Sequence, residues 1–247
     1  MADKKTVELK EVGLKPERDY PKIKVPPPGK EARRIVRHDE KHSSSSYIKV
    51  YPLVVKRGEG AMIEDVDGNR YIDFMAGIAV ACTGHAHPKV VKAIQDAAAK
   101  FLHICGTDFY YESMADLCAR LAALGPGRSN KRVFLTNSGT EAVEGAIKLA
   151  RNATRRSELI AFRGAFHGRS MGAMSLTSSK VTQRGTFGPL MPGVHHVPYP
   201  DPYRLETAGR NAGDFIIDHI RKDLFQTHVS PSDVAAVLVE PMLGEGG

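Results

Sequence analysis

An α/β fold with a mainly parallel sheet and flanking helices is predicted for most of this chain. Strand-like and helix-like segments alternate from residue 132 onward, which is typical of β-α-β units. A short antiparallel β segment precedes them, because β-type runs between residues 51 and 74 are separated by glycine-rich turns. The chain closes on a glycine-rich turn, 241–247, directly after an apolar strand. We therefore expect the fold to be incomplete at its C-terminus, as the front portion of a larger enzyme.

Three parts are expected along the chain. Residues 1–45 are rich in Lys, Arg, Pro and Ser, and we expect an N-terminal arm that is mobile or lies over a partner subunit. Residues 46–80 are expected to be part of a small domain, and residues 81–247 the first portion of a large domain. The small domain is predicted to contain antiparallel strands at 51–55, 61–65 and 70–74.

The large domain shows helical spacing of apolar residues after Pro88. A second helix is predicted over 112–124, where a Gly-Pro-Gly sequence ends it. The elements expected after it are a strand at 132–136, a helix at 141–152, a strand at 158–162, a helical or turn region at 171–176, a helix near 213–222 and a strand at 234–239.

Composition and charge argue against several classes of protein. No apolar stretch approaches the roughly 18 residues of a membrane helix. The charged N-terminus, which includes acidic residues, is unlike a secretory signal or a transit peptide. The 3 cysteines form no CxxC pair, which fits a reduced, cytoplasmic protein. The net charge is +7, but the basic residues are spread along the chain, so we expect electrostatic steering of anionic substrates rather than a nucleic-acid partner.

The strongest local signal for chemistry is the turn between the strand at 132–136 and the next helix. Backbone N–H groups at Gly139, Thr140 and Glu141 would point out of the helix start, which suits a phosphate. Ser138 and Thr140 would add hydroxyl donors. The alternative is a plain N-cap that satisfies the first helical turn. The pattern matches neither a P-loop nor a dinucleotide fingerprint.

Two further signals follow strands. Phe166 could stack on a flat heteroaromatic ring, and His167 could orient that ring or relay protons, although Phe166 could equally be a core residue. Glu240 and Glu245 lie at or just past the carboxyl end of a strand, the edge where open α/β sheets bind ligands.

Other motifs are set aside. His85 and His87 form an H-x-H pair without a third ligand at metal-like spacing, so we expect no metal site. The GxSxG pattern of a hydrolase nucleophile is also missing.

Taken together, these segments resemble the class III aminotransferases, the ornithine, acetylornithine and 4-aminobutyrate type, which use pyridoxal phosphate (PLP). The resemblance covers about residues 51–247 and implies the fold type I of PLP-dependent transferases. The segments that carry it occur in the family's order and are 65–74, 76–80, 84–88, 136–151, 165–169, 240–241 and 244–247.

The resemblance implies a role for each matched residue. Ser138, Gly139 and Thr140 would hold the PLP phosphate. Phe166 would stack on the pyridine ring, with His167 beside it as a catalytic group.

Three further positions follow from the resemblance. Glu240 would lie near the cofactor. Glu245 resembles the family's switch carboxylate, which pairs with an arginine until the second substrate's α-carboxylate needs that arginine. Ile78 matches a position in the substrate pocket.

The lysine that forms the Schiff base with PLP is expected to lie beyond this chain. Lys148 is inside a predicted helix and Lys180 is in a polar loop, so neither has the right context. We expect the chain alone to bind PLP weakly and to show no turnover.

The activity that the resemblance implies is transamination of an ω-amino acid, such as 4-aminobutyrate, ornithine or acetylornithine, with 2-oxoglutarate as amino acceptor. The 4-aminobutyrate branch is the best match, although Thr107 stands where that branch has a glutamine. An amino-acid racemase on the same fold is the nearest alternative, and a non-catalytic truncated subunit is another. The expected partners are small amino-acid and keto-acid substrates, with assembly as a homodimer or a dimer of dimers.

Overall fold

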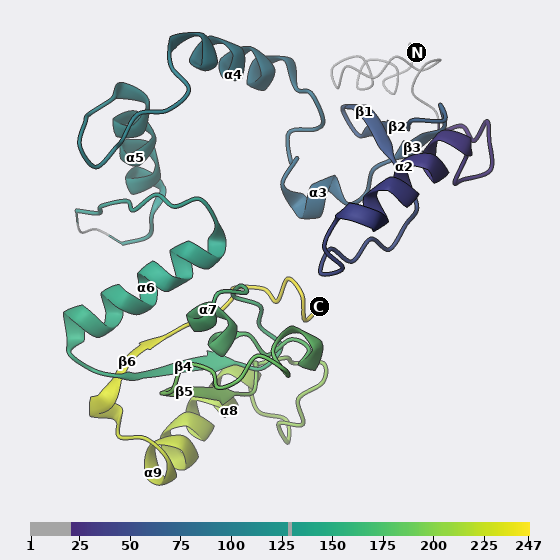
Figure 1. The fold of residues 1–247 in the computed structure, drawn as a ribbon. Coiled ribbons are helices and arrows are strands. Elements are labelled where there is room, and N and C mark those ends of the chain that lie inside the picture. Colours follow the sequence, from purple (N-terminus) through teal and green to yellow (C-terminus); the bar gives the residue numbers. More distant parts are fainter. Residues whose placement is uncertain (1–20, 128–129) are drawn as a thin grey trace, which may run out of the picture. The chain divides into compact units, whose positions relative to one another are not determined.

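The computed structural model describes residues 21–127 and 130–247, so the first 20 residues of the expected arm lie outside the described residues. The chain divides into two compact units, with the boundary between Phe109 and Tyr110 (Figure 1). Within the described ranges, no helix has both the length and the apolar character needed to cross a membrane.

The first unit is built on a three-stranded antiparallel sheet in the order β1-β2-β3. Its strands are β1 (Val55–Glu59), β2 (Met62–Asp65) and β3 (Arg70–Ile72). The predicted antiparallel sheet is confirmed, but the expected first strand at 51–55 is wrong except for its last residue. Pairing with β2 begins only at Val55, so the residues before it have no strand opposite them.

A helix, α2 (Lys30–His42), forms where the sequence suggested an arm. Its first turn is capped from the β2–β3 hairpin, because the Asp67 carboxylate accepts from the amides of Glu31 and Ala32, both at 3.0 Å. Buried Asn69 accepts from two amides of the segment just before the helix. The helix α2 was not predicted because its sequence has few apolar residues, and its contact with the rest of the unit depends on side chains of the hairpin.

After β3 the chain makes a turn, α3 (Ala76–Ala79), in which each of the four residues has a positive φ. Non-glycine residues rarely adopt this left-handed conformation. Helix α4 (Pro88–Lys100) then starts at the proline, as predicted.

The second unit contains a parallel sheet in the order β5-β4-β6. The middle strand is β4 (Glu158–Phe162), flanked by β5 (Val194–Val197) and β6 (Val234–Val237). The helical elements of this unit are α5 (Glu112–Leu124), α6 (Gly139–Thr154), α7 (Met171–Leu176), η1 (Val181–Gln183), α8 (Ala212–His219), the π-helical turn η2 (Ile220–Leu224), α9 (Phe225–Thr227) and η3 (Pro231–Asp233).

The core of the second unit lies on both faces of β4. Ile160 and Phe162 pack against α8 and η2, while Leu159 and Ala161 pack against α6 and α7. Successive side chains of a strand point to opposite faces, so a continuous apolar run serves a sheet that is covered on both sides. The predicted α/β fold with flanking helices is therefore confirmed.

The expected strand at 132–136 is wrong. No strand among the described residues pairs with this segment, and the side chain of Phe134 is 77% exposed. Residues 130–136 instead run without regular structure into α6, which starts two residues earlier than predicted.

Candidate active site

The carboxyl ends of the three parallel strands meet at one edge of the sheet, where α/β folds bind ligands. At this edge, β4 is followed by the loop 163–170. Strand β5 is followed by the segment with Tyr199, and β6 by the segment with Glu240. The Tyr199 hydroxyl donates to the backbone oxygen of Glu240 over 3.0 Å and therefore ties two of these exits together.

The N-terminus of α6 leaves two backbone donors available beside this edge. Ser138 caps the helix by accepting from the amide of Glu141 at 3.4 Å. In the described part of the chain, nothing accepts from the amides of Gly139 or Thr140. Together with the helix dipole, these amides form a cradle suited to an anion.

The loop after β4 runs directly against this helix start. Gly168 has a φ of +135°, and a Cβ there would lie 2.3 Å from the Thr140 Oγ1. The backbone of the loop can approach Thr140 only because residue 168 has no side chain.

Glu240 anchors the same loop from the other side. Its two carboxylate oxygens accept from the amide of Phe166 at 2.7 Å and from the amide of Gly244 at 2.8 Å. The Arg169 guanidinium lies over the Phe166 ring, with Cζ 5.8 Å from the ring centroid. Phe166 is half-buried, and its ring is held at the site by the bond of its own amide to Glu240 and by the contact with Arg169.

His167 is held by its backbone, since its amide donates to the Thr177 Oγ1 at 2.9 Å. Its Nε2 is buried and has no hydrogen-bond partner among the described residues. Burial lowers the pKa of His167, although the charge of Glu240 raises it in part. Burial therefore favours the neutral imidazole, in which one ring nitrogen is an acceptor and the other a donor.

Glu245 pairs with Lys180, whose Nζ lies 2.5 Å from the carboxylate, and Gln183 donates to the same oxygen at 3.3 Å. The Lys180 hydrogen bond and charge lower the pKa of Glu245, and the positive charge of Arg169 contributes to the lowering. Glu245 is thus an ionised carboxylate at the rim of the site. Sequence reasoning had set Lys180 aside as a polar-loop residue.

The structure thus brings seven of the eight sequence-predicted residues into one region of the second unit, while Ile78 belongs to the first unit. Ile78 is 81% exposed in the left-handed turn. Sequence reasoning missed Glu144 and Ser170, which bond to one another, while Ser170 alone also bonds to Thr140. Their spacing places Glu144 one helical turn after Thr140 and Ser170 before a helical run, but it does not indicate the bonds that join them.

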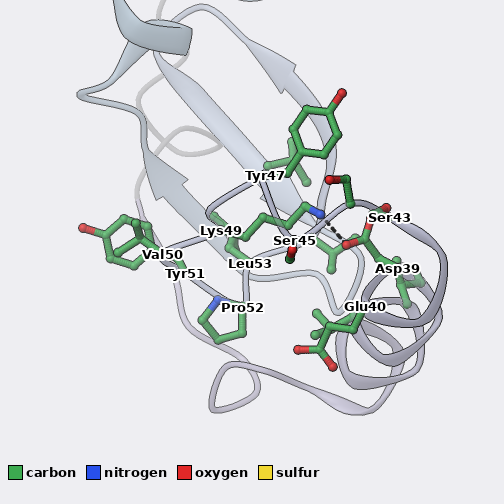
Figure 2. Close-up of a pocket in the computed structure, with 15 residues that line it drawn as sticks. Asp39, Glu40, Ser43, Ser45, Tyr47, Lys49, Val50, Tyr51, Pro52 and Leu53 are labelled. Atoms are coloured by element: carbon green, nitrogen blue, oxygen red, sulfur yellow. Dashed lines mark hydrogen bonds and ion pairs between the residues drawn. The ribbon is translucent and has the colours of Figure 1, made fainter. Parts of the chain in front are cut away.

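A separate pocket of about 590 Å³ lies within the first unit, between α2 and residues 43–55. Figure 2 shows the ion pair between Lys49 and Asp39 at its wall. None of the sequence-predicted site residues lines it.

Comparison of the sequence with known protein families shows which family the chain belongs to. The family described as aminotransferase class-III matches residues 43–247. The chain belongs to this family. Its segments form part of the fold type I of PLP-dependent enzymes, and the cofactor that the family indicates is pyridoxal phosphate.

Curated relatives of this class-III aminotransferase chain include both aminotransferases and racemases. The alanine/serine racemase of Pyrococcus horikoshii is 40% identical over 93% of this chain and 50% of that protein. The 4-aminobutyrate aminotransferase of Mycobacterium leprae is 41% identical over 79% of this chain and 44% of that protein. The chain spans about half the length of the curated relatives it matches.

Among solved structures, an ornithine aminotransferase from Toxoplasma gondii with PLP at its active site matches all of this chain. The TM-score is 0.70 and the identity 28%, and the match covers 100% of this chain and 51% of that one.

The residues of the class-III chain fit this cofactor. The two unbonded amides and the helix dipole suit a phosphate, and the half-buried Phe166 ring suits a flat pyridine. Nearby, the buried Nε2 of His167 lacks a partner among the described residues.

Proposed function

We propose that the protein catalyses transamination of an ω-amino acid, such as 4-aminobutyrate, ornithine or acetylornithine, with 2-oxoglutarate as amino acceptor. The observation that carries the proposal is the convergence of an anion-binding helix start with Phe166, His167 and Glu240 at the carboxyl edge of the sheet. Relatives named for 4-aminobutyrate, 5-aminovalerate and acetylornithine support this substrate class.

The chain's own residues would bind and orient the cofactor. Ser138, Gly139 and Thr140 would hold its phosphate, and Phe166 would cover one face of its ring. When bound, pyridoxal phosphate supplies the electron sink for removing a proton from the carbon that bears the amino group.

His167 and Glu245 would act at the rim of the site. His167 would orient the ring through its imidazole, whose Nε2 has no hydrogen-bond partner among the described residues. Glu245 is bonded to Lys180 and Gln183 in the structure, and it would exchange these partners for an ion pair with an arginine of the full protein.

A coupled assay of the protein that contains this sequence tests the activity. We expect keto-acid-dependent transfer of the amino group from an ω-amino donor to 2-oxoglutarate. Residues 1–247 alone should bind PLP weakly and show no turnover, because neither Lys148 nor Lys180 has the setting of the cofactor-bearing lysine. Turnover by residues 1–247 alone would contradict that second expectation.

Amino-acid racemization is the second candidate, and it is favoured by two relatives, the racemase noted above and an isoleucine 2-epimerase from Lentilactobacillus buchneri that is 36% identical. A racemase would invert an amino acid without a keto acid. Loss of optical rotation in the absence of 2-oxoglutarate would therefore decide for racemization and against transamination.

We also infer that the protein is cytoplasmic and assembles as a homodimer or a dimer of dimers. The free cysteines Cys82, Cys105 and Cys118 support a reducing location, and the family resemblance supports the dimer.

A further inference from the structure

A chain of side-chain hydrogen bonds links the anion cradle to the start of α7. The Ser170 Oγ donates to the Glu144 Oε1 at 2.5 Å, and it also lies 2.6 Å from the Thr140 Oγ1. The same Glu144 oxygen accepts from the amide of Ala173 at 3.0 Å. Glu144 therefore fixes both the first turn of α7 and the serine that contacts Thr140.

The number of available hydrogens decides which group is the donor in each of these hydrogen bonds. A serine hydroxyl has one hydrogen, and an ionised carboxylate can only accept. Since Ser170 gives its hydrogen to Glu144, the Thr140 hydroxyl must donate to Ser170. The Thr140 Oγ1 also accepts from the Ser170 amide at 3.3 Å. The Thr140 hydroxyl therefore uses its only hydrogen and one of its lone pairs in bonds to Ser170. The donors that remain for an anion are the amides of Gly139 and Thr140 and the Ser138 hydroxyl.

The backbone at two glycines lies close against these hydrogen-bonded side chains. A Cβ on Gly172 would lie 2.4 Å from the Glu144 Oε2, and one on Gly168 would lie 2.3 Å from the Thr140 Oγ1. Helix α7 is almost wholly buried from Gly172 to Leu176. The carboxylate and both hydroxyls are therefore held in place by backbone as well as by their own bonds.

We propose that Glu144 and Ser170 are positioning residues for the phosphate of the cofactor. They act through Thr140, whose locked side chain fixes the orientation of the two amides that bind the anion. This inference rests on the proposed function, because it assumes that the cradle binds the phosphate of PLP.

The test is a titration of the protein that contains this sequence with PLP and with pyridoxal, which lacks the phosphate, followed by fluorescence. Removing one hydrogen-bonding partner should weaken PLP binding about tenfold in Ser170→Ala, and Glu144→Leu should lose at least as much. Binding of pyridoxal should not change. Ser170→Thr keeps the hydroxyl and Glu144→Gln keeps an acceptor oxygen, so both should restore most of the PLP affinity.

Ser175→Ala is the matched control. Ser175 is a buried serine of α7, the helix that begins directly after Ser170, and it makes two hydrogen bonds, to the Met171 oxygen and from the Met191 amide, neither of them with Thr140. The Ser175→Ala variant should be destabilised as much as Ser170→Ala but should bind PLP like the unaltered protein. If Ser170→Ala and Ser175→Ala match in PLP affinity, or if pyridoxal binding falls equally, the positioning role is refuted and the proposed function stands. If the unaltered protein binds neither ligand, the cofactor site itself is refuted.

Discussion

Gly168 is the residue on which the shape of the cradle depends most directly. Gly168→Ala places a methyl group 2.3 Å from the Thr140 Oγ1, in a backbone conformation with a φ of +135° that L-residues avoid. We expect destabilisation of about 2 kcal/mol and a matching loss of PLP affinity. Thermal unfolding and PLP titration of the chain measure both.

The control for this substitution is Gly209→Ala. Gly209 also has a positive φ, +81°, but nothing lies within 4 Å of its Cβ position. It should show the conformational cost alone, with PLP binding unchanged. Equal effects of the two variants on PLP affinity would contradict the close-approach explanation for Gly168.

At the scale of elements, the left-handed turn α3 needs support, because each non-glycine residue in this conformation costs roughly 1–2 kcal/mol. Asp73 supplies this support. Its Oδ1 accepts from the amides of Met75 and Ala76 at 2.8 and 3.0 Å, and its Oδ2 lies 2.6 Å from the His85 Nε2. The backbone of His85 is in turn paired in both directions with Gly60 at the β1–β2 hairpin.

The support should depend on pH. The hydrogen bond with His85, followed by those from Met75 and Ala76, lowers the pKa of Asp73. A carboxyl whose pKa is lower in the folded state stabilises that state above the unfolded pKa, and this stability is lost as pH falls through the folded value. Asp73→Asn should therefore lower the free energy of unfolding by about 1 kcal/mol at pH 7, with the deficit shrinking below about pH 4.

Thermal unfolding of both proteins from pH 7 to pH 3 measures this. Asp96→Asn is the comparison, since Asp96 forms an exposed pair with Lys92 on α4 and should contribute little. A deficit in Asp73→Asn that stays constant over the whole pH range would argue against the ionised carboxylate as the support.

At the scale of the whole molecule, locally encoded elements were predicted best. The helix at 112–124 and the strand at 158–162 have the bounds that their periodicity and flanking residues indicated. The segment 132–136 looked the same locally but has no pairing strand among the described residues. Strand β5 was missed because its two central residues are histidines, although His195 is accommodated by a pair with Glu158 at 2.8 Å.

The residues of the candidate site were also predicted best where the sequence signal is local. Ser138, Gly139, Thr140, Phe166 and Glu240 were found because each stands in a motif next to a strand or helix end. The link from Glu144 through Ser170 to Thr140 joins residues 26 and 30 positions apart. It depends on how α6 packs against α7, which no local pattern encodes.

Among the described residues, several large apolar side chains are highly exposed. Phe74, Leu102, Leu124 and Phe134 are each between 77% and 92% exposed. Burying such side chains is favourable by about 1.5–3 kcal/mol each, so the chain should self-associate or bind a partner subunit. Light scattering at increasing concentration should show a rising mass, and a hydrophobic dye should bind the dilute chain. A constant monomer mass without dye binding would show that these side chains are covered in solution, contrary to this expectation.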